Sequence, residues 1–119
     1  MQYMALIYAD EGAWEGLDAE EREDVYRRYR ELADDARAAG VLVGGDELAS
    51  TRDATTVRMR EGQALVVDGP YAETKETLGG YFLFECASID EAVDWAGRIP
   101  TAERGAVEVR PVYSDHEEL

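Results

Sequence analysis

Apolar residues fall into short runs and into two periodic stretches along the chain. Residues 3–8 and 81–86 are apolar almost throughout, which predicts strands, because a helix needs ~10 or more residues. From Val25 to Ala36 the apolar positions recur in steps of four, three and four. This spacing predicts an amphipathic helix that begins after Asp18 and ends before Gly40.

The second half of the chain carries three further patterns. Residues 56–67 alternate around the turn pair Glu61-Gly62, which predicts a β-hairpin. Residues 89–99 follow Ser88, a typical N-terminal capping residue, and have helical spacing. Residues 107–112 predict a last strand.

The elements follow one another as strand, helix, three strands, helix and strand. A short apolar run at 41–43 is part of the crossing into the hairpin or an additional short strand. This order predicts an α+β, ferredoxin-like antiparallel sheet with two helices on one face. We expect residues 1–119 to form a single domain, with a frayed tail over 114–119.

Both faces of the central strands are apolar, as Tyr3, Tyr8 and Leu83 indicate. One layer of helices covers only one of these faces, and a large exposed apolar face is uncommon on a monomer. We therefore expect a homodimer whose two sheets pack face to face and enclose a cavity, burying more than ~1,500 Å² in total.

Composition narrows the possible functions. The chain has 12 basic and 27 acidic side chains, a net charge of −15 that would repel phosphate backbones. We therefore expect no direct binding of nucleic acid. No apolar run approaches the ~18–20 residues of a membrane span, and the first residues lack the basic segment of a signal peptide. With a single cysteine, the sequence favours a cytoplasmic protein.

Most catalytic arrangements are excluded by residue type. The single histidine, His116, lies in the acidic tail, and Cys86 ends an apolar strand with no base beside it. Such a thiol is typical of a packed side chain rather than of a nucleophile. No cluster has zinc spacing, and no glycine pair fits a phosphate loop. We expect neither a metal nor a cofactor.

The chemically richest segment is 68–76, D-G-P-Y-A-E-T-K-E. It begins where a strand that we expect to be buried stops, so a partly desolvated Asp68 could serve as an acid or a base. Our candidate ligand-binding residues are Asp68, Gly69, Pro70, Tyr71, Glu73, Thr74 and Lys75. The alternative is structural: Asp68 caps the turn, and Lys75 pairs with Glu73 or Glu76 on the surface.

This segment, together with L-G-G-Y-F-L-F-E at 78–85, resembles the signature of the DGPF branch of the YCII-related proteins. Tyr71 stands where that branch usually has phenylalanine. The resemblance extends over nearly the whole chain. It includes Y-M-A-L-I-Y at 3–8, A-G-V-L-V-G-G-D-E-L at 39–48, I-D-E-A-V-D-W-A at 89–96 and V-E-V-R-P-V at 107–112.

The resemblance implies a dimeric α/β barrel, as in muconolactone isomerases and small heme-handling or monooxygenase relatives. A histidine–aspartate pair has been suggested as the active site of YCII proteins. This chain has no histidine in its first long helix, so only the Asp68 side of such a site carries over. The DGPF branch also resembles proteins encoded beside alternative sigma factors, which implies an accessory or regulatory role with a transcription-related partner.

Two functions remain open. In the first, the protein binds an unknown small molecule near the 68–76 motif, or meets a protein partner, without catalysis. In the second, it is a muconolactone-isomerase-like enzyme that uses Asp68 as acid or base and Tyr71 or Lys75 to polarise the substrate. The missing histidine favours the first.

Overall fold

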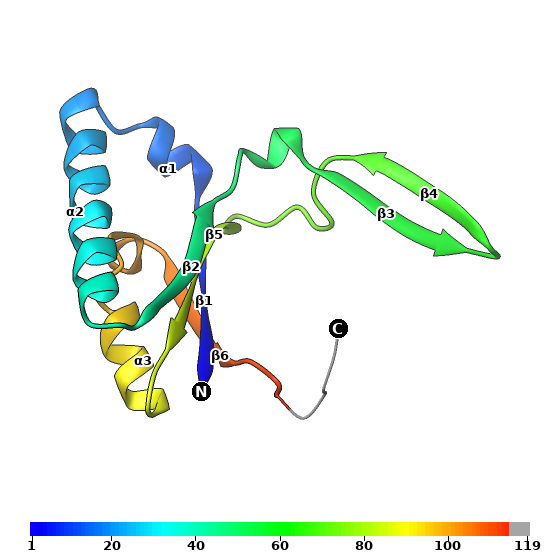
Figure 1. Ribbon diagram of the computed structural model, residues 1–119. Coiled ribbons are helices and arrows are strands. Elements are labelled where there is room, and N and C mark those ends of the chain that lie inside the picture. The colour runs from blue at the N-terminus through cyan, green and yellow to red at the C-terminus, as the bar shows by residue number, and fades with distance from the viewer. Residues whose placement is uncertain (115–119) are drawn as a thin grey trace.

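The computed structural model describes residues 1–114, and the last five residues, which include His116, lie outside the described part. Strands β1, β2, β5 and β6 form one antiparallel sheet, and helices α2 and α3 lie on one of its faces (Figure 1). The elements are β1 (Gln2–Ala9), α1 (Glu11–Glu15), α2 (Ala19–Ala38), β2 (Leu42–Glu47), η1 (Thr51–Asp53), β3 (Thr55–Arg60), β4 (Gln63–Asp68), β5 (Thr77–Glu85), α3 (Ile89–Ala96), η2 (Pro100–Glu103) and β6 (Ala106–Pro111).

The order of the strands across the sheet is β2-β5-β1-β6. The first strand along the chain is thus central, and the last pairs with it at one edge. In the register, Ala5 of β1 lies between Phe82 of β5 and Val109 of β6. The predicted α+β, ferredoxin-like fold is confirmed.

Local signals account for the long helix α2. The Asp18 carboxylate accepts from the backbone N–H of Glu21 at 2.8 Å, and the Glu21 carboxylate accepts from the N–H of Asp18 at 3.2 Å. This capping box satisfies two amides that the first helical turn leaves without partners. Leu32 and Ala36, on the predicted apolar stripe, are buried.

The core lies between this helical layer and the sheet. Leu32, Phe84 and Ile99 are the largest fully buried side chains. The Phe84 ring stacks on Phe82 with 5.6 Å between centroids. Cys86 is buried beside them, and this burial raises the pKa of its thiol, as expected for a packed cysteine.

Two strands are longer than their patterns indicate. Strand β5 begins at Thr77, before the predicted strand at 81–86, and β2 continues to Glu47, beyond the short apolar run at 41–43. Glycine has a packing role here. A Cβ at Gly80 would lie 2.8 Å from the backbone oxygen of Asp46 in β2, so the glycine permits close approach of the two strands.

The predicted hairpin forms, but it stands apart from the sheet. Strands β3 and β4 pair only with each other, around a turn in which Glu61 (φ 51°) and Gly62 (φ 77°) both have the positive φ of a type I′ turn. We call residues 55–68 the arm. Figure 1 shows the arm projecting from the sheet on the side opposite the helices.

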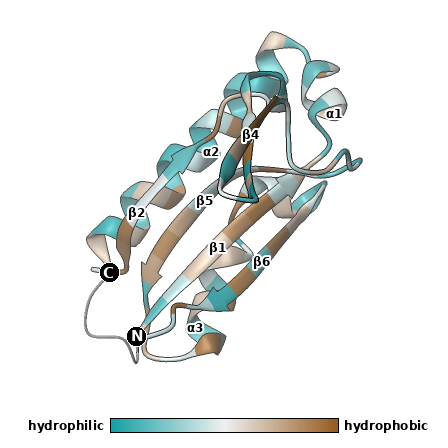
Figure 2. Cartoon of the chain, turned by 90° about the vertical axis from the view of Figure 1, so that its right-hand side faces the viewer, coloured by the Kyte–Doolittle hydropathy of each residue, from teal (hydrophilic) through white to brown (hydrophobic). Residues whose placement is uncertain are grey.

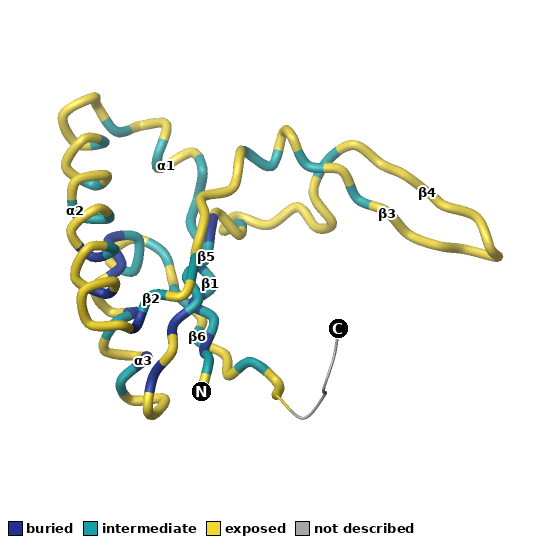
Figure 3. Tube along the Cα trace, viewed as in Figure 1, coloured by how far each residue is buried: buried dark blue, intermediate teal, exposed yellow. Residues whose placement is uncertain are grey.

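The position of the arm corrects one expectation. Every residue of β4 is exposed, so Asp68 does not end a buried strand (Figure 3). The apolar run at 64–67 predicts burial within a sheet, whereas β4 pairs with β3 outside the four-stranded sheet and is exposed. The radius of gyration agrees, at 16.3 Å against about 13.5 Å for a compact chain of this length.

Within residues 1–114, no layer of helices or strands covers the sheet face opposite the helices. Figure 2 looks onto this open face. The register places Met4, Leu6 and Tyr8 of β1 beside Leu83 and Tyr81 of β5 on it, and all five are half-buried in the single chain. The central strands therefore have two apolar faces, of which the helices cover one. Along residues 1–114, no helix combines the length and the apolar character needed to cross a membrane.

The core generates a stability prediction. Phe84→Ala should lower the free energy of unfolding by about 3–5 kcal/mol, because it removes a fully buried ring and leaves a cavity. Val93→Ala, on the exposed side of α3, should change it by less than about 0.5 kcal/mol. Urea unfolding followed by circular dichroism measures both, and equal effects would contradict the assignment of the core.

Candidate functional site

The 68–76 motif leaves the arm, crosses outside the sheet and leads into β5. Backbone contacts fix its start. The N–H of Gly69 donates to the carbonyl of Ala54 at 2.7 Å, and the Thr56 hydroxyl donates to the carbonyl of Gly69 at 2.8 Å. These bonds join the two ends of the arm where it meets the body, so the motif starts from a defined position.

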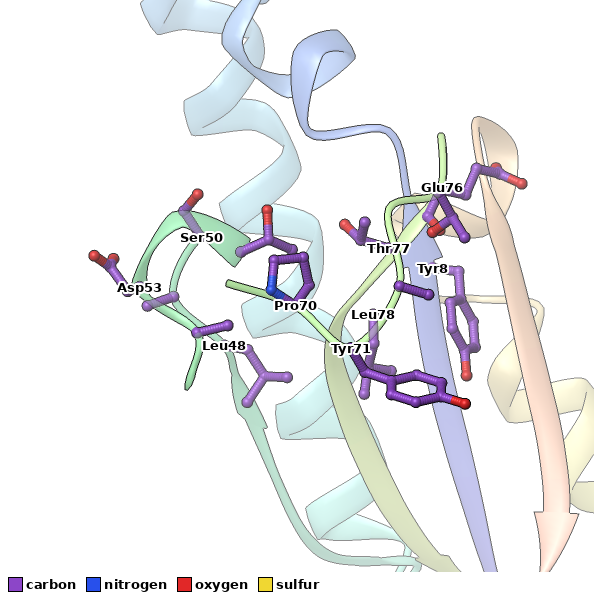
Figure 4. A pocket seen from close by; sticks show the side chains of 14 residues that line it. Tyr8, Leu48, Ser50, Asp53, Pro70, Tyr71, Glu76, Thr77 and Leu78 are labelled. Atoms are coloured by element: carbon purple, nitrogen blue, oxygen red, sulfur yellow. The ribbon is translucent and has the colours of Figure 1, made fainter. Parts of the chain in front are cut away.

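The motif forms one wall of a cleft of about 590 Å³, and residues 48–54 form the opposite wall (Figure 4). The lining residues are Tyr8, Leu48, Ala49, Ser50, Thr51, Asp53, Ala54, Pro70, Tyr71, Ala72, Thr74, Glu76, Thr77 and Leu78. Tyr8 brings the cleft to the end of the open sheet face. Three segments distant in the sequence thus meet here.

The cleft combines an apolar surface with neutral hydroxyl groups and acidic side chains. Leu48, Tyr71 and Leu78 supply apolar surface, and threonine and serine hydroxyls supply neutral hydrogen-bonding groups. Its charged side chains, Asp53 and Glu76, are both acidic. Such a cleft favours a neutral or cationic molecule with an apolar part, because an anion would meet carboxylates without a compensating cation.

A smaller cleft of about 290 Å³ adjoins the larger one along the motif. Its walls are Thr51, Arg52, Gly69, Pro70, Ala72, Glu73, Thr74 and Thr77. Arg52 and Glu73 give this cleft charges of both signs. Three residues of the motif, Pro70, Ala72 and Thr74, line both clefts.

The predicted site residues are distributed unequally. Pro70, Tyr71 and Thr74 line the larger cleft, and Gly69 and Glu73 line the smaller one together with Pro70 and Thr74. Asp68 and Lys75 line neither.

The polar ends of these two residues are also without partners. Within residues 1–114, the Asp68 carboxylate has no ion pair or hydrogen bond, and Lys75 forms no ion pair with Glu73 or Glu76. The structure thus does not contain the surface ion pair of the structural alternative.

Tyr71 connects the cleft with the arm. Its side chain is 75% exposed, and the guanidinium of Arg58 in β3 lies 5.0 Å from the centre of its ring. A cation over an aromatic ring at this distance is attracted by the ring's electron density. The phenol that lines the cleft is therefore held in part by a side chain of the arm.

Sequence reasoning missed Glu11, which orders the opposite wall. Its carboxylate accepts from the backbone N–H of Thr51 at 2.8 Å, from the Thr51 hydroxyl at 2.9 Å and from the Ser50 hydroxyl at 3.4 Å. The Thr51 backbone bond is the main reason that the pKa of Glu11 lies below its usual value. The only local signal is the Asp10 cap of the short helix α1, which does not indicate so distant a partner.

No metal site is found along the described residues, where no three histidine, cysteine or carboxylate side chains lie close enough to hold an ion. The candidate site is therefore a ligand cleft without a recognisable metal centre in residues 1–114.

Fold and cleft define a small α+β protein with a concave site between a sheet and a projecting arm. Comparison with known proteins agrees with the resemblance seen in the motif. The family model of the YCII-related domain matches residues 1–114, and the chain belongs to this family. An uncharacterised protein of Rhizobium meliloti (strain 1021) is 40% identical over 114 residues, covering 94% of this chain and 92% of the relative.

Glu11 gives a pH-dependent prediction. Because its folded pKa is lowered, its contribution to stability is complete above the unfolded value of about 4.3 and is lost as the pH falls through the folded pKa. Glu11→Ala should weaken the protection of the Thr51 amide from hydrogen exchange and lower stability by about 1 kcal/mol at pH 7.

Glu15→Ala is the matched control, because Glu15 lies on the same helix and its carboxylate forms an exposed ion pair with Arg52. Amide exchange measured by NMR at pH 7 and at pH 3 should separate the two variants. Equal protection of Thr51 in both would show that the Glu11 contact does not order this wall.

Proposed function

We propose that this protein binds a small, neutral or cationic molecule with an apolar part in the larger cleft beside the 68–76 motif. The observation that carries the proposal is the composition of this cleft, in which apolar side chains stand beside a few hydroxyl and carboxylate side chains. A volume of about 590 Å³ lies within the usual ~300–1,000 Å³ of small-molecule sites.

The charge of the protein supports this class of ligand. The chain carries a net charge of −15, so its surface field attracts cations and repels anions before contact. The charged residues that line the cleft, Asp53 and Glu76, are both acidic. Tyr71 adds an aromatic face, which favours a cationic head group further.

A pair of aromatic probes of opposite charge tests the proposal. Benzylamine should shift the methyl resonances of Leu48 and Leu78 in a saturable titration by NMR, whereas benzoate should not. Binding of both probes with equal affinity would remove the charge argument. Absence of any shift with benzylamine would contradict the proposed ligand class.

Two leucines of similar exposure provide the variant and its control. Leu48 is 43% exposed and lines the cleft, whereas Leu65 is 48% exposed and lies on the arm. Leu48→Ala should weaken benzylamine about fivefold through lost apolar contact, as reported by the Leu78 methyl resonances. Leu65→Ala should leave the affinity unchanged, and an equal loss in both variants would contradict the assignment of the cleft.

Asp68 distinguishes binding from catalysis. The enzymatic alternative requires Asp68 as acid or base, but its carboxylate is exposed and lines neither cleft in the single chain. Asp68→Asn should therefore leave benzylamine affinity and the melting temperature nearly unchanged. Turnover of a molecule that co-purifies with the protein, lost in Asp68→Asn at unchanged stability, would overturn this expectation and support the enzyme.

The proposal includes a homodimer in which the open sheet face meets a second copy. The half-buried apolar side chains of β1 and β5 on that face support it. An accessory role beside an alternative sigma factor rests on the family resemblance alone. Its test is direct co-purification of the protein with such a factor.

A further inference from the structure

The two faces of the arm differ in chemistry. In the β3–β4 register, Val57 lies opposite Val66, and Met59 lies opposite Ala64, so these four side chains share one face. These four are apolar, and Thr55 and Asp68 stand on the same face at the base of the arm. The other face carries Thr56, Arg58, Arg60, Gln63, Leu65 and Val67. We call the face that carries Val57, Met59, Ala64 and Val66 the apolar face of the arm.

In the described part of the single chain, this apolar face is exposed. Val57 and Met59 are each 59% exposed, and Val66 is 62% exposed (Figure 3). A two-stranded hairpin alone in water is marginally stable at best, because it has no second layer on which to bury side chains. The arm nevertheless holds a regular six-residue register throughout. A contact that covers the apolar face would supply the missing layer.

The direction of the arm restricts what that contact is. The arm projects on the side of the sheet that the helices leave open (Figure 1). The same side presents the half-buried Met4, Leu6 and Tyr8. A second copy placed against this open face would therefore lie beside the arm, and two-fold symmetry would give each copy the same contact.

Charge favours a second copy as well. The arm has Arg58 and Arg60 against Glu61 and Asp68, so its formal charge is zero, and the whole net charge of −15 lies elsewhere on the chain. Two copies that approach through most surfaces repel each other. Because the arm carries no net charge, a contact made through it adds no net repulsion between the two copies.

We propose that two copies exchange arms: each arm lays its apolar face on the open sheet face of the other copy. The occupant is a second copy of this chain, and the contact is isologous. This goes beyond the stacking of two sheets, because the arm is part of the interface. None of the observations that support the exchange depends on the ligand proposed above.

Two neighbouring valines test which face of the arm makes the contact. Val66 and Val67 are both 62% exposed but lie on opposite faces. Val66→Glu should raise the dimer dissociation constant about tenfold or more, measured by sedimentation velocity, because it would bury a carboxylate in the contact. Val67→Glu should leave dissociation unchanged. A monomeric wild type, an unaffected Val66→Glu variant, or equal effects in both variants would each overturn the proposal.

A second measurement shows whether the arm reaches the other copy or folds back on its own sheet. A spin label attached at Gln63→Cys marks the arm, and the methyl group of Met4 marks the open face. Native Cys86 is buried and serves as the unlabelled background. One batch of protein carries the spin label, a second batch carries the labelled methionine methyl group, and the two batches are mixed so that mixed dimers form.

Broadening of the Met4 methyl resonance in this mixture supports arm exchange. In a second sample, both markers are on the same chain, which is diluted with unlabelled copies. Broadening in this sample alone would show that the arm folds back on its own sheet, and it would overturn the proposal. Absence of broadening in both samples would show that the arm contacts neither sheet, which overturns it equally. Circular dichroism of the two glutamate variants checks that the four-stranded sheet is intact.

Discussion

One layer of helices on a sheet with two apolar faces is the constraint on which the rest of this structure depends. Helices α2 and α3 bury Phe84 and its neighbours on one side. On the other side Met4, Leu6 and Tyr8 stay half-buried, and hydrophobic burial is the main favourable term in folding. The side that lacks a helical layer is also the side on which the arm projects and near which the cleft opens.

The root of the arm is where fold and site meet. The bonds from Gly69 to Ala54 and from Thr56 to Gly69 close the base of the hairpin. Glu11 fixes Thr51 directly before it. These contacts hold the two walls of the cleft at a set separation, although neither wall belongs to the four-stranded sheet. A site made from loops at such a root depends on local hydrogen bonds rather than on the core.

How much of the structure could be predicted from the sequence depends on how far apart in the chain the interacting residues lie. The limits of α2 depend on Asp18 and Glu21, neighbours in the chain, and the turn of the arm depends on Glu61 and Gly62. The exposure of β4 could not be read from its apolar residues, because burial is set by where the whole hairpin points. The contact of Glu11 with Thr51 spans 40 residues and carries no motif, so sequence pattern does not reveal it. The 68–76 motif lies along a cleft wall, but the sequence does not indicate which of its side chains line the cleft.

Tyr71 shows why arm and cleft should be considered together. Its ring lines the cleft and also lies under the Arg58 guanidinium, so one side chain belongs to both. Any displacement of the arm that moves Arg58 changes the contacts of that ring. Coupling between two sites is reciprocal, and so a molecule that holds the ring in the cleft would also bias the arm. A variant that reports on one of these two contacts must therefore leave Tyr71 intact. Substitutions at Val66, on the arm, and at Leu48, in the cleft, meet this condition.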